Sequence, residues 1–142
     1  MRNPYAQQRE LYPANWKDIA TSVKTSANWR CQECDRPCRK PKEAWDEFCG
    51  RLLTDEPLGW HYETYDEVSD DSGLSTCIDR PQRFTLTVAD LDRDPANCET
   101  SNLKAMCSGC HRRYDAALHR ANASATRYKK REATGQINLL TN

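Results

Sequence analysis

Two cysteines and a histidine follow a short apolar run in the segment Ser101-Asn102-Leu103-Lys104-Ala105-Met106-Cys107-Ser108-Gly109-Cys110-His111. Residues 103–106 predict a short strand that runs into Cys107, and the chain is expected to turn helical from Ser108 or Gly109. Cys107 and Cys110 can present two thiolates from one turn, which is half of a tetrahedral zinc site. A second pair with the same spacing, Cys31 and Cys34, stands far upstream.

Two Cys-x-x-Cys pairs in one chain predict a structural zinc centre. Four thiolates close a tetrahedral site with Zn–S bonds of about 2.3 Å. A redox dithiol needs only one such pair, so the second pair favours metal. Because the mean hydropathy is −0.95, we expect the zinc to contribute much of the folding free energy. The predicted ligands are Cys31, Cys34, Cys107 and Cys110.

Length and composition place the chain in a broad class. Its 142 residues fit a single domain, 1–142, and its apolar runs are far shorter than the ~20 residues that a membrane-spanning helix needs. Residues 1–10 have no apolar h-region, so we expect a cytoplasmic protein without a membrane partner. In that reducing compartment, eight cysteines favour metal over disulfides. Cys38 is an alternative zinc ligand, and Cys49, Cys77 and Cys98 are expected to be ordinary buried or half-exposed thiols.

The net charge of zero conceals a division along the chain. Residues 1–42 carry +5, residues 43–79 carry −10, residues 80–110 are neutral and residues 111–142 carry +5. One interpretation is that these are only solvated faces. The other is that the two basic ends form a phosphate-binding face and the acidic segment lies elsewhere.

Periodicity predicts the main elements. Residues 16–23 should form a helix with Asn15 as N-cap, and residues 84–89 alternate as a strand buried on one side. The C-terminal helix should continue to a stop near Gly135, and residues 43–83 are interpreted as an inserted loop or small excursion. The expected apolar stripes are Trp16, Ile19, Ala20, Val23 and Ala27 in the first helix, and Tyr114, Leu118, Ala121, Ala125 and Tyr128 in the last.

In this order the pieces resemble a zinc-stabilised HNH endonuclease of the ββα-metal (His-Me finger) superfamily. The resemblance covers about residues 29–120 without the insert, and it rests on the Cys31-x-x-Cys34 pair, residues 87–95 and the Asn102-to-His111 block. It implies an α+β fold, a small zinc-stabilised ββα-metal core with an N-terminal helix, an acidic insert and a long basic C-terminal helix. The corresponding segments are 1–30 (N-terminal helical segment), 31–42 (zinc knuckle), 43–83 (acidic insert), 84–131 (ββα core) and 132–142 (tail).

The resemblance also implies roles for individual residues. In the family, a histidine at the end of the first strand is the general base, an asparagine braces the loop that holds it, and a last histidine binds a catalytic divalent metal. Asn102 falls on the bracing position and His111 on the metal-ligand position, but Asp90 stands where the general base should be. An ordinary aspartate, with a pKa near ~3.9, is a weak base at neutral pH. Asp90 therefore either has its pKa raised by burial or ligates the metal instead.

His111 and Asp115 are four residues apart on one helix face, and with Asp92 they are the expected site for a catalytic Mg²⁺ or Mn²⁺. The alternatives are a supporting or substitute zinc ligand for His111, a helix-surface ion pair with Arg112 or Arg113 for Asp115, and a turn-capping role for Asp92. The residues expected to hold phosphates are Arg93, Arg112, Arg113, Arg120, Lys129, Lys130 and Arg131.

Three functions remain open from the sequence. The first is a metal-dependent endonuclease that hydrolyses DNA phosphodiesters, impaired or not by Asp90. The second is a catalytically degenerate HNH fold that binds DNA or serves as an adaptor in a nucleoprotein complex of a mobile element, a phage or a defence system. In that case residues 43–79 would dock a protein partner. The third is a small zinc protein whose acidic segment mimics DNA.

Overall fold

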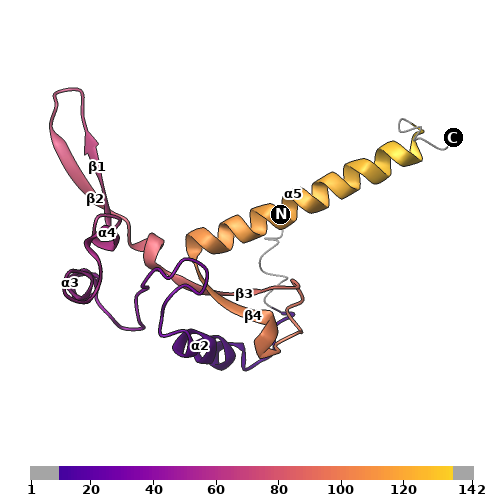
Figure 1. Ribbon diagram of the computed structural model, residues 1–142, viewed down its shortest axis with the longest axis horizontal. Helices are drawn as coiled ribbons and strands as arrows, with labels where there is room; N and C mark the ends of the chain where they lie inside the picture. The colour runs from indigo at the N-terminus through magenta and orange to yellow at the C-terminus, as the bar shows by residue number, and fades with distance from the viewer. Residues whose placement is uncertain (1–9, 136–142) are drawn as a thin grey trace. The chain divides into compact units, whose positions relative to one another are not determined.

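The computed structural model describes residues 10–135, which form an α+β chain with four helices and two antiparallel two-stranded sheets. The chain has two compact units, one ending at His111 and one beginning at Arg112. None of the described helices combines the length and the apolar character needed to cross a bilayer. In order along the chain (Figure 1), the elements are α2 (Trp16–Ser26), α3 (Trp45–Asp55), α4 (Leu58–His61), β1 (Tyr65–Ser69), β2 (Ser75–Asp79), β3 (Leu86–Asp90), β4 (Leu103–Cys107) and α5 (Ser108–Ala133).

Strands β3 and β4 form the central hairpin of the first unit. They pair from Leu86 opposite Cys107 to Asp90 opposite Leu103. Both predicted strands are confirmed, but β3 begins two residues later than expected because Phe84 belongs to a preceding 3-10 turn, Pro81–Phe84. Four of the five residues of β4 are buried. The β3–β4 hairpin therefore forms part of the core of this unit.

Helix α2 lies against the β3–β4 hairpin (Figure 1). The predicted helix is confirmed, and all five residues of its predicted apolar stripe are at least half-buried while most residues between them are exposed. Asn15 occupies the N-cap position, but its side chain makes no capping hydrogen bond. Its backbone carbonyl instead accepts from the amides of Asp18 and Ile19 at 3.1 and 3.2 Å. Apolar burial, more than capping, thus stabilises this helix.

The acidic insert is more ordered than the sequence analysis expected. The interpretation as a loop is wrong, because α3, α4 and the β1–β2 hairpin occupy it. Phe48, Leu52 and Phe84 are fully buried together, and Trp45 and Trp60 pack against them. The helical spacing of Trp45, Phe48 and Leu52 is a signal that could have found α3. The high acidic content of the segment favoured a loop over this helix.

Arginines that precede the acidic insert, and others near its end, neutralise part of its charge. The pairs are Arg30 with Glu56, Arg36 with Glu63, and Arg80 and Arg83 with Asp66. Arg36 also lies over two aromatic rings, with its guanidinium carbon 5.0 Å from the Trp60 ring centre and 5.1 Å from that of Phe84. The insert is therefore joined to the zinc knuckle by both charge and packing.

Helix α5 begins at Ser108 and runs to Ala133, and Gly135 follows with a φ of 69°. The predicted start and the glycine stop are confirmed. The predicted core-facing stripe is wrong from Ala121 onward, because Ala121, Ala125 and Tyr128 are exposed. Apolar residues at helical spacing were therefore too weak a signal for burial in this basic helix.

The adjacent leucines of α3 provide a test of the insert core. Leu52 is fully buried and Leu53 is 51% exposed. We expect Leu52→Ala to lower the free energy of unfolding by about 2–5 kcal/mol, and Leu53→Ala to change it by less than about 0.5 kcal/mol. Chemical denaturation of the zinc-loaded proteins measures both values. Equal effects of the two substitutions would contradict a packed insert.

Candidate metal centre and the adjoining polar cluster

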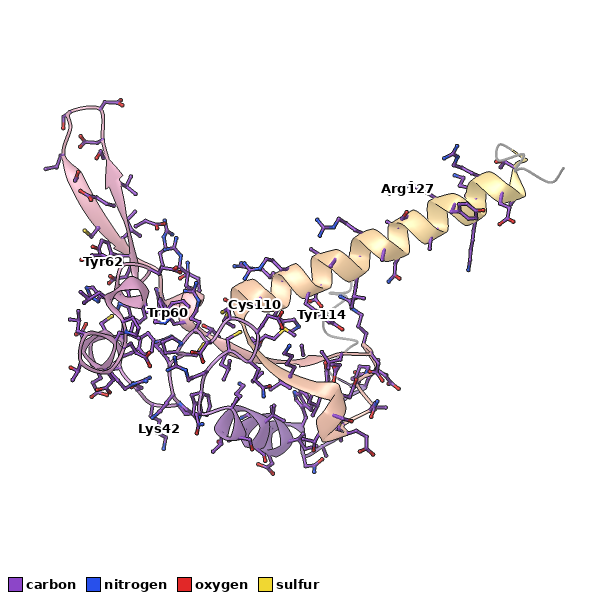
Figure 2. All side chains as sticks on the ribbon, viewed as in Figure 1. Lys42, Trp60, Tyr62, Cys110, Tyr114 and Arg127 are labelled. Atoms are coloured by element: carbon purple, nitrogen blue, oxygen red, sulfur yellow. The ribbon has the colours of Figure 1, made fainter. Side chains whose placement is uncertain are left out.

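Four cysteine sulfurs gather at the junction of the zinc knuckle and the start of α5. The Sγ atoms of Cys31, Cys34, Cys107 and Cys110 all lie within 4.8 Å of one another. Cys34 Sγ and Cys107 Sγ are 3.8 Å apart. Bonds of about 2.3 Å to a tetrahedral ion separate two sulfurs by about 3.8 Å, so the cluster fits a structural metal such as zinc. Figure 2 shows Cys110 beside neighbouring sulfur atoms.

Backbone hydrogen bonds shape the knuckle that carries the first two cysteines. The amide of Cys31 donates to the carbonyl of Arg36 at 2.9 Å, and Asp35 adopts a left-handed φ of 64°. Gln32 fastens this turn to β4, because its amide donates to the Ala105 carbonyl and its side-chain Oε1 accepts from the Ala105 amide, both at 2.8 Å. Gln32 thereby sets the distance between the two cysteine pairs.

The thiols of the cluster differ in acidity. Burial opposes the Cys31 thiolate, but backbone amides, led by that of Cys107, outweigh it and lower the pKa of Cys31 to about 7. Burial raises the pKa values of Cys34 and Cys110. A divalent cation would offset the repulsion of four thiolates held this close, which is the usual reason for such a cluster.

The remaining cysteines do not join the cluster in the described part of the chain. Cys38, the alternative ligand, is fully buried and its thiol donates to the Arg36 carbonyl at 3.6 Å. Burial and the neighbouring thiolates raise its pKa to about 12, so it stays a neutral thiol. Cys49 and Cys98 are half-buried as expected, whereas Cys77 is exposed on β2.

Asn102 organises the loop after β3. Its Nδ2 donates to the Asn97 carbonyl and to Asp92 Oδ1, both at 2.9 Å, and its Oδ1 accepts from the Asp92 amide at 3.0 Å. The side chain is buried, and the Asn102 carbonyl also accepts from the Leu91 amide at 2.8 Å. Asn102 thus braces the segment that follows Asp90.

Asp92 takes part in the same network. One of its oxygens accepts from the Asp94 amide as well as from Asn102, and the other accepts from the Asn97 side chain at 2.7 Å. These bonds hold the pKa of the Asp92 carboxyl below its usual range, with Asn97 the largest cause. This geometry favours the turn-capping alternative, and metal binding by Asp92 stays a prediction.

Asp90 ends β3 in a partly buried position. The Tyr12 hydroxyl donates to Asp90 Oδ2 at 2.7 Å, while Asp90 Oδ1 is buried without a hydrogen-bond partner. Burial raises the pKa of the Asp90 carboxyl, and the charges of Asp92 and Asp94 raise it further, although the Tyr12 hydroxyl and His111 act in the opposite direction. The shift is in the direction that a general base at neutral pH requires.

His111 is oriented by the strand below it. The Thr87 hydroxyl donates to the Met106 carbonyl at 2.9 Å, and Thr87 Oγ1 lies 2.8 Å from His111 Nδ1. Because the hydroxyl has a single proton, Nδ1 is assigned as the donor of that second bond. The lone pair of the neutral ring is then on Nε2, the atom that would accept a proton or a metal ion.

The other predicted site residues are distributed over both units. Arg93 is exposed in the loop after β3 with a φ of 60°. The second unit carries the predicted metal ligand Asp115, which is half-buried, and the predicted phosphate contacts Arg112, Arg113, Arg120, Lys129, Lys130 and Arg131, which are exposed. Their roles at the site stay predictions.

Three positioning residues escaped the sequence analysis. Gln32, Tyr12 and Thr87 contact Ala105, Asp90 and His111 across 73, 78 and 24 positions of sequence, respectively. No local pattern marks such partners, because each is chosen by the packing of distant segments. Only the location of Gln32 between two predicted zinc ligands was a hint.

Comparisons with protein-family models, with curated proteins and with solved structures find no match for this chain. The assignment of chemistry therefore rests on the residues and their geometry.

The four-sulfur cluster predicts tightly held zinc. We expect about one Zn²⁺ per chain, and we expect Cys107→Ser to lose the metal and unfold at much lower temperature, because a structural zinc site supplies folding free energy. Cys77→Ser, which changes an exposed thiol on β2, should keep the metal and the melting temperature. Elemental analysis and thermal unfolding measure both properties. Full stability after complete removal of zinc would contradict a structural site.

The buried oxygen of Asp90 predicts a stability difference that depends on pH. A carboxyl with a raised folded-state pKa destabilises the fold once it ionises, so Asp90→Asn should raise the melting temperature by a few degrees at most at neutral pH. The advantage should shrink as the pH falls toward the raised pKa. Thermal unfolding of both proteins with zinc present, from about pH 8 to about pH 5, measures it. A variant that is less stable than the parent throughout would show that the charge is favourable.

Proposed function

We propose that this chain is an HNH-type nucleic-acid-binding protein, a metal-dependent endonuclease that hydrolyses DNA phosphodiesters. The observation that carries the proposal is one connected arrangement: a strand ending in Asp90, a loop braced by Asn102, and a second strand leading through the sulfur cluster into His111. Two antiparallel strands followed by a helix, with these residues at the turns, are what the resemblance to the family leads us to expect.

The chemistry of the three polar residues supports hydrolysis. Asp90 has a raised pKa and a buried oxygen without a hydrogen-bond partner, which suits a group that takes a proton from water. His111 is fixed through Nδ1 by Thr87, so its Nε2 is presented in a set direction. Asn102 limits the movement of the backbone next to Asp90. Together they form a preorganised polar site.

A catalytic Mg²⁺ or Mn²⁺ would stabilise the charge that develops on the phosphate. His111 is the residue we assign to it, with Asp115 and Asp92 as further candidates. Nitrogen and carboxylate oxygen are suitable donors for Mn²⁺, and carboxylate oxygen for Mg²⁺. The exposed arginines and lysines of α5, together with Arg93, are suited to hold the DNA backbone.

A second candidate is a catalytically inactive HNH-like adaptor. Aspartate at the base position favours it, and so does the exposed apolar surface of the β1–β2 hairpin. Val68 and Ile78 share one face of that hairpin by register, and together with Leu74 they are 40–65% exposed. An isolated two-stranded hairpin is marginally stable by itself, so a covering partner would stabilise it. Because residues 43–79 carry −10, the partner proposed here is a protein with a basic surface.

Plasmid nicking by the parent protein and by Asp90→His separates the two candidates. If Asp90 is a working base, the parent nicks DNA with Mg²⁺ or Mn²⁺, and Asp90→His is faster by no more than about 10²-fold. If only Asp90→His cuts, the parent is the adaptor. Zinc content is measured in both proteins so that unfolding is not mistaken for inactivity.

Two histidines of α5 give a matched control for the same assay. His111→Ala should abolish nicking, since it removes the assigned metal ligand, whereas His119→Ala changes an exposed residue without an assigned role and should keep it. Equal activity of His111→Ala and the parent would remove His111 from the proposed site. Failure of every protein to nick, with zinc bound, would refute the endonuclease.

A further inference from the structure

A cavity of about 540 Å³ lies in the first unit, between α2, the end of the zinc knuckle and the start of β3. The residues that line it are unusually basic. Glu43 is the one acid among them, and the cations are Lys17, Lys24, Arg39, Lys40 and Lys42. Figure 2 marks Lys42, the last of these cations along the chain. None of the five is among the individual phosphate contacts that the sequence predicted, although all lie in the basic segment 1–42 that one interpretation of the charge pattern places in a phosphate-binding face.

In the described part of the chain, the cations of this cavity outnumber the acids that line it, five to one. Glu43 is held by Arg51 through two contacts of 2.9 Å. Within residues 10–135, none of the five cations forms an ion pair with a carboxylate. Burial lowers the pKa of Lys24, and Arg39 Nε is buried without a hydrogen-bond partner. Such a cavity attracts an anion, and a buried guanidinium nitrogen without a partner gains from one.

Two indole rings line the same cavity. Trp16 is half-buried on α2, and Trp29 lies beside Lys24, whose Nζ is 5.8 Å from the ring centre. Trp29 has a φ of 56° and Lys42 a φ of 63°, conformations that side chains of this size seldom adopt. Strained backbone of this kind concentrates at binding sites. Indole faces stack on nucleic-acid bases, and interleaved cations hold the phosphates between them.

We propose that this cavity binds a nucleotide unit of single-stranded nucleic acid, its base against an indole ring and its phosphates on the lysines. A base in a duplex has both faces covered, so stacking on tryptophan requires an unpaired strand. The volume suits a ligand of this size, since sites for small organic molecules occupy about 300–1,000 Å³. The choice of nucleic acid as the source of the phosphate rests on the proposed function.

The cavity is also connected, through Tyr12, to Asp90 of the proposed catalytic site. The Tyr12 ring lies 4.5 Å from the Trp16 ring, centre to centre, and the Tyr12 hydroxyl donates to Asp90. One aromatic side chain therefore separates a cavity-lining indole from the assigned base. An unpaired strand held at Trp16 would lie near the site proposed for cleavage. The inference therefore rests on the proposed function and adds to it that the bound strand is single-stranded.

The test uses the full-length zinc-loaded protein and two double variants with equal loss of charge. Lys40→Gln/Lys42→Gln removes two exposed cations of the cavity, and Lys129→Gln/Lys130→Gln removes two exposed cations of α5. The probes are a labelled oligothymidylate of about twelve nucleotides, AMP and inorganic phosphate. Binding is followed by fluorescence anisotropy and by quenching of tryptophan emission, over a range of salt concentrations.

The expected result is AMP binding that quenches tryptophan emission and weakens tenfold or more in Lys40→Gln/Lys42→Gln but not in Lys129→Gln/Lys130→Gln, because the α5 lysines are assigned to the backbone of a longer strand and not to the cavity. Oligothymidylate should quench tryptophan emission in the parent protein and lose this quenching in the cavity variant. The slope of log affinity against log salt should fall by about 1.4 in the cavity variant, at about 0.7 per lost phosphate contact on a single strand. AMP binding as tightly as the oligonucleotide would support the site with a free nucleotide as its ligand.

Three results would overturn the inference: no binding of the oligonucleotide or AMP, equal losses of AMP binding in the two double variants, or inorganic phosphate competing as well as AMP. Plasmid nicking is measured on the same samples. Nicking without oligonucleotide binding refutes the cavity and leaves the proposed function standing. Oligonucleotide binding without nicking supports the cavity and refutes the proposed endonuclease.

Discussion

Four sulfur atoms from two distant parts of the chain lie within 4.8 Å of one another, and most of the first unit depends on that closure. The cluster joins the knuckle at Cys31 and Cys34 to the turn between β4 and α5. Burial and the neighbouring thiols raise the pKa values of Cys34 and Cys110, so a bound cation would make four thiolates at this distance favourable. In a chain with mean hydropathy of −0.95, such a cross-link replaces part of a hydrophobic core.

The sulfur cluster also positions His111 and the strand residues that orient it. Gln32, within the knuckle, is bonded to Ala105 on both its amide and its side chain, so metal binding and the position of β4 are linked. Strand β4 carries the Met106 carbonyl that fixes the Thr87 hydroxyl, and through it His111. Loss of zinc should therefore disorder the proposed site as well as destabilise the fold.

Charged groups differ in whether the protein supplies them with partners. Carboxylates of the acidic insert pair with arginines that precede it and with arginines near its end, and its aromatic core packs against Arg36. The basic cavity beside α2 lacks such partners, and the buried Asp90 oxygen lacks a donor. Buried polar groups without partners are found more often at sites that bind or react with another molecule.

The sequence by itself determined the two cysteine pairs, the strands around residues 84–90 and 103–107, the start of α2 and the limits of α5, because each depends on spacing within a few residues. It also indicated Asn102 as the brace of the loop after Asp90. The packing of the insert, the Tyr12 contact to Asp90 and the Thr87 contact to His111 were decided only by the tertiary structure. The basic cavity belongs with them, since it combines residues of α2 with residues near the start of β3. These features join residues far apart in the chain, where the energy of a contact depends on the fold and not on the local pattern.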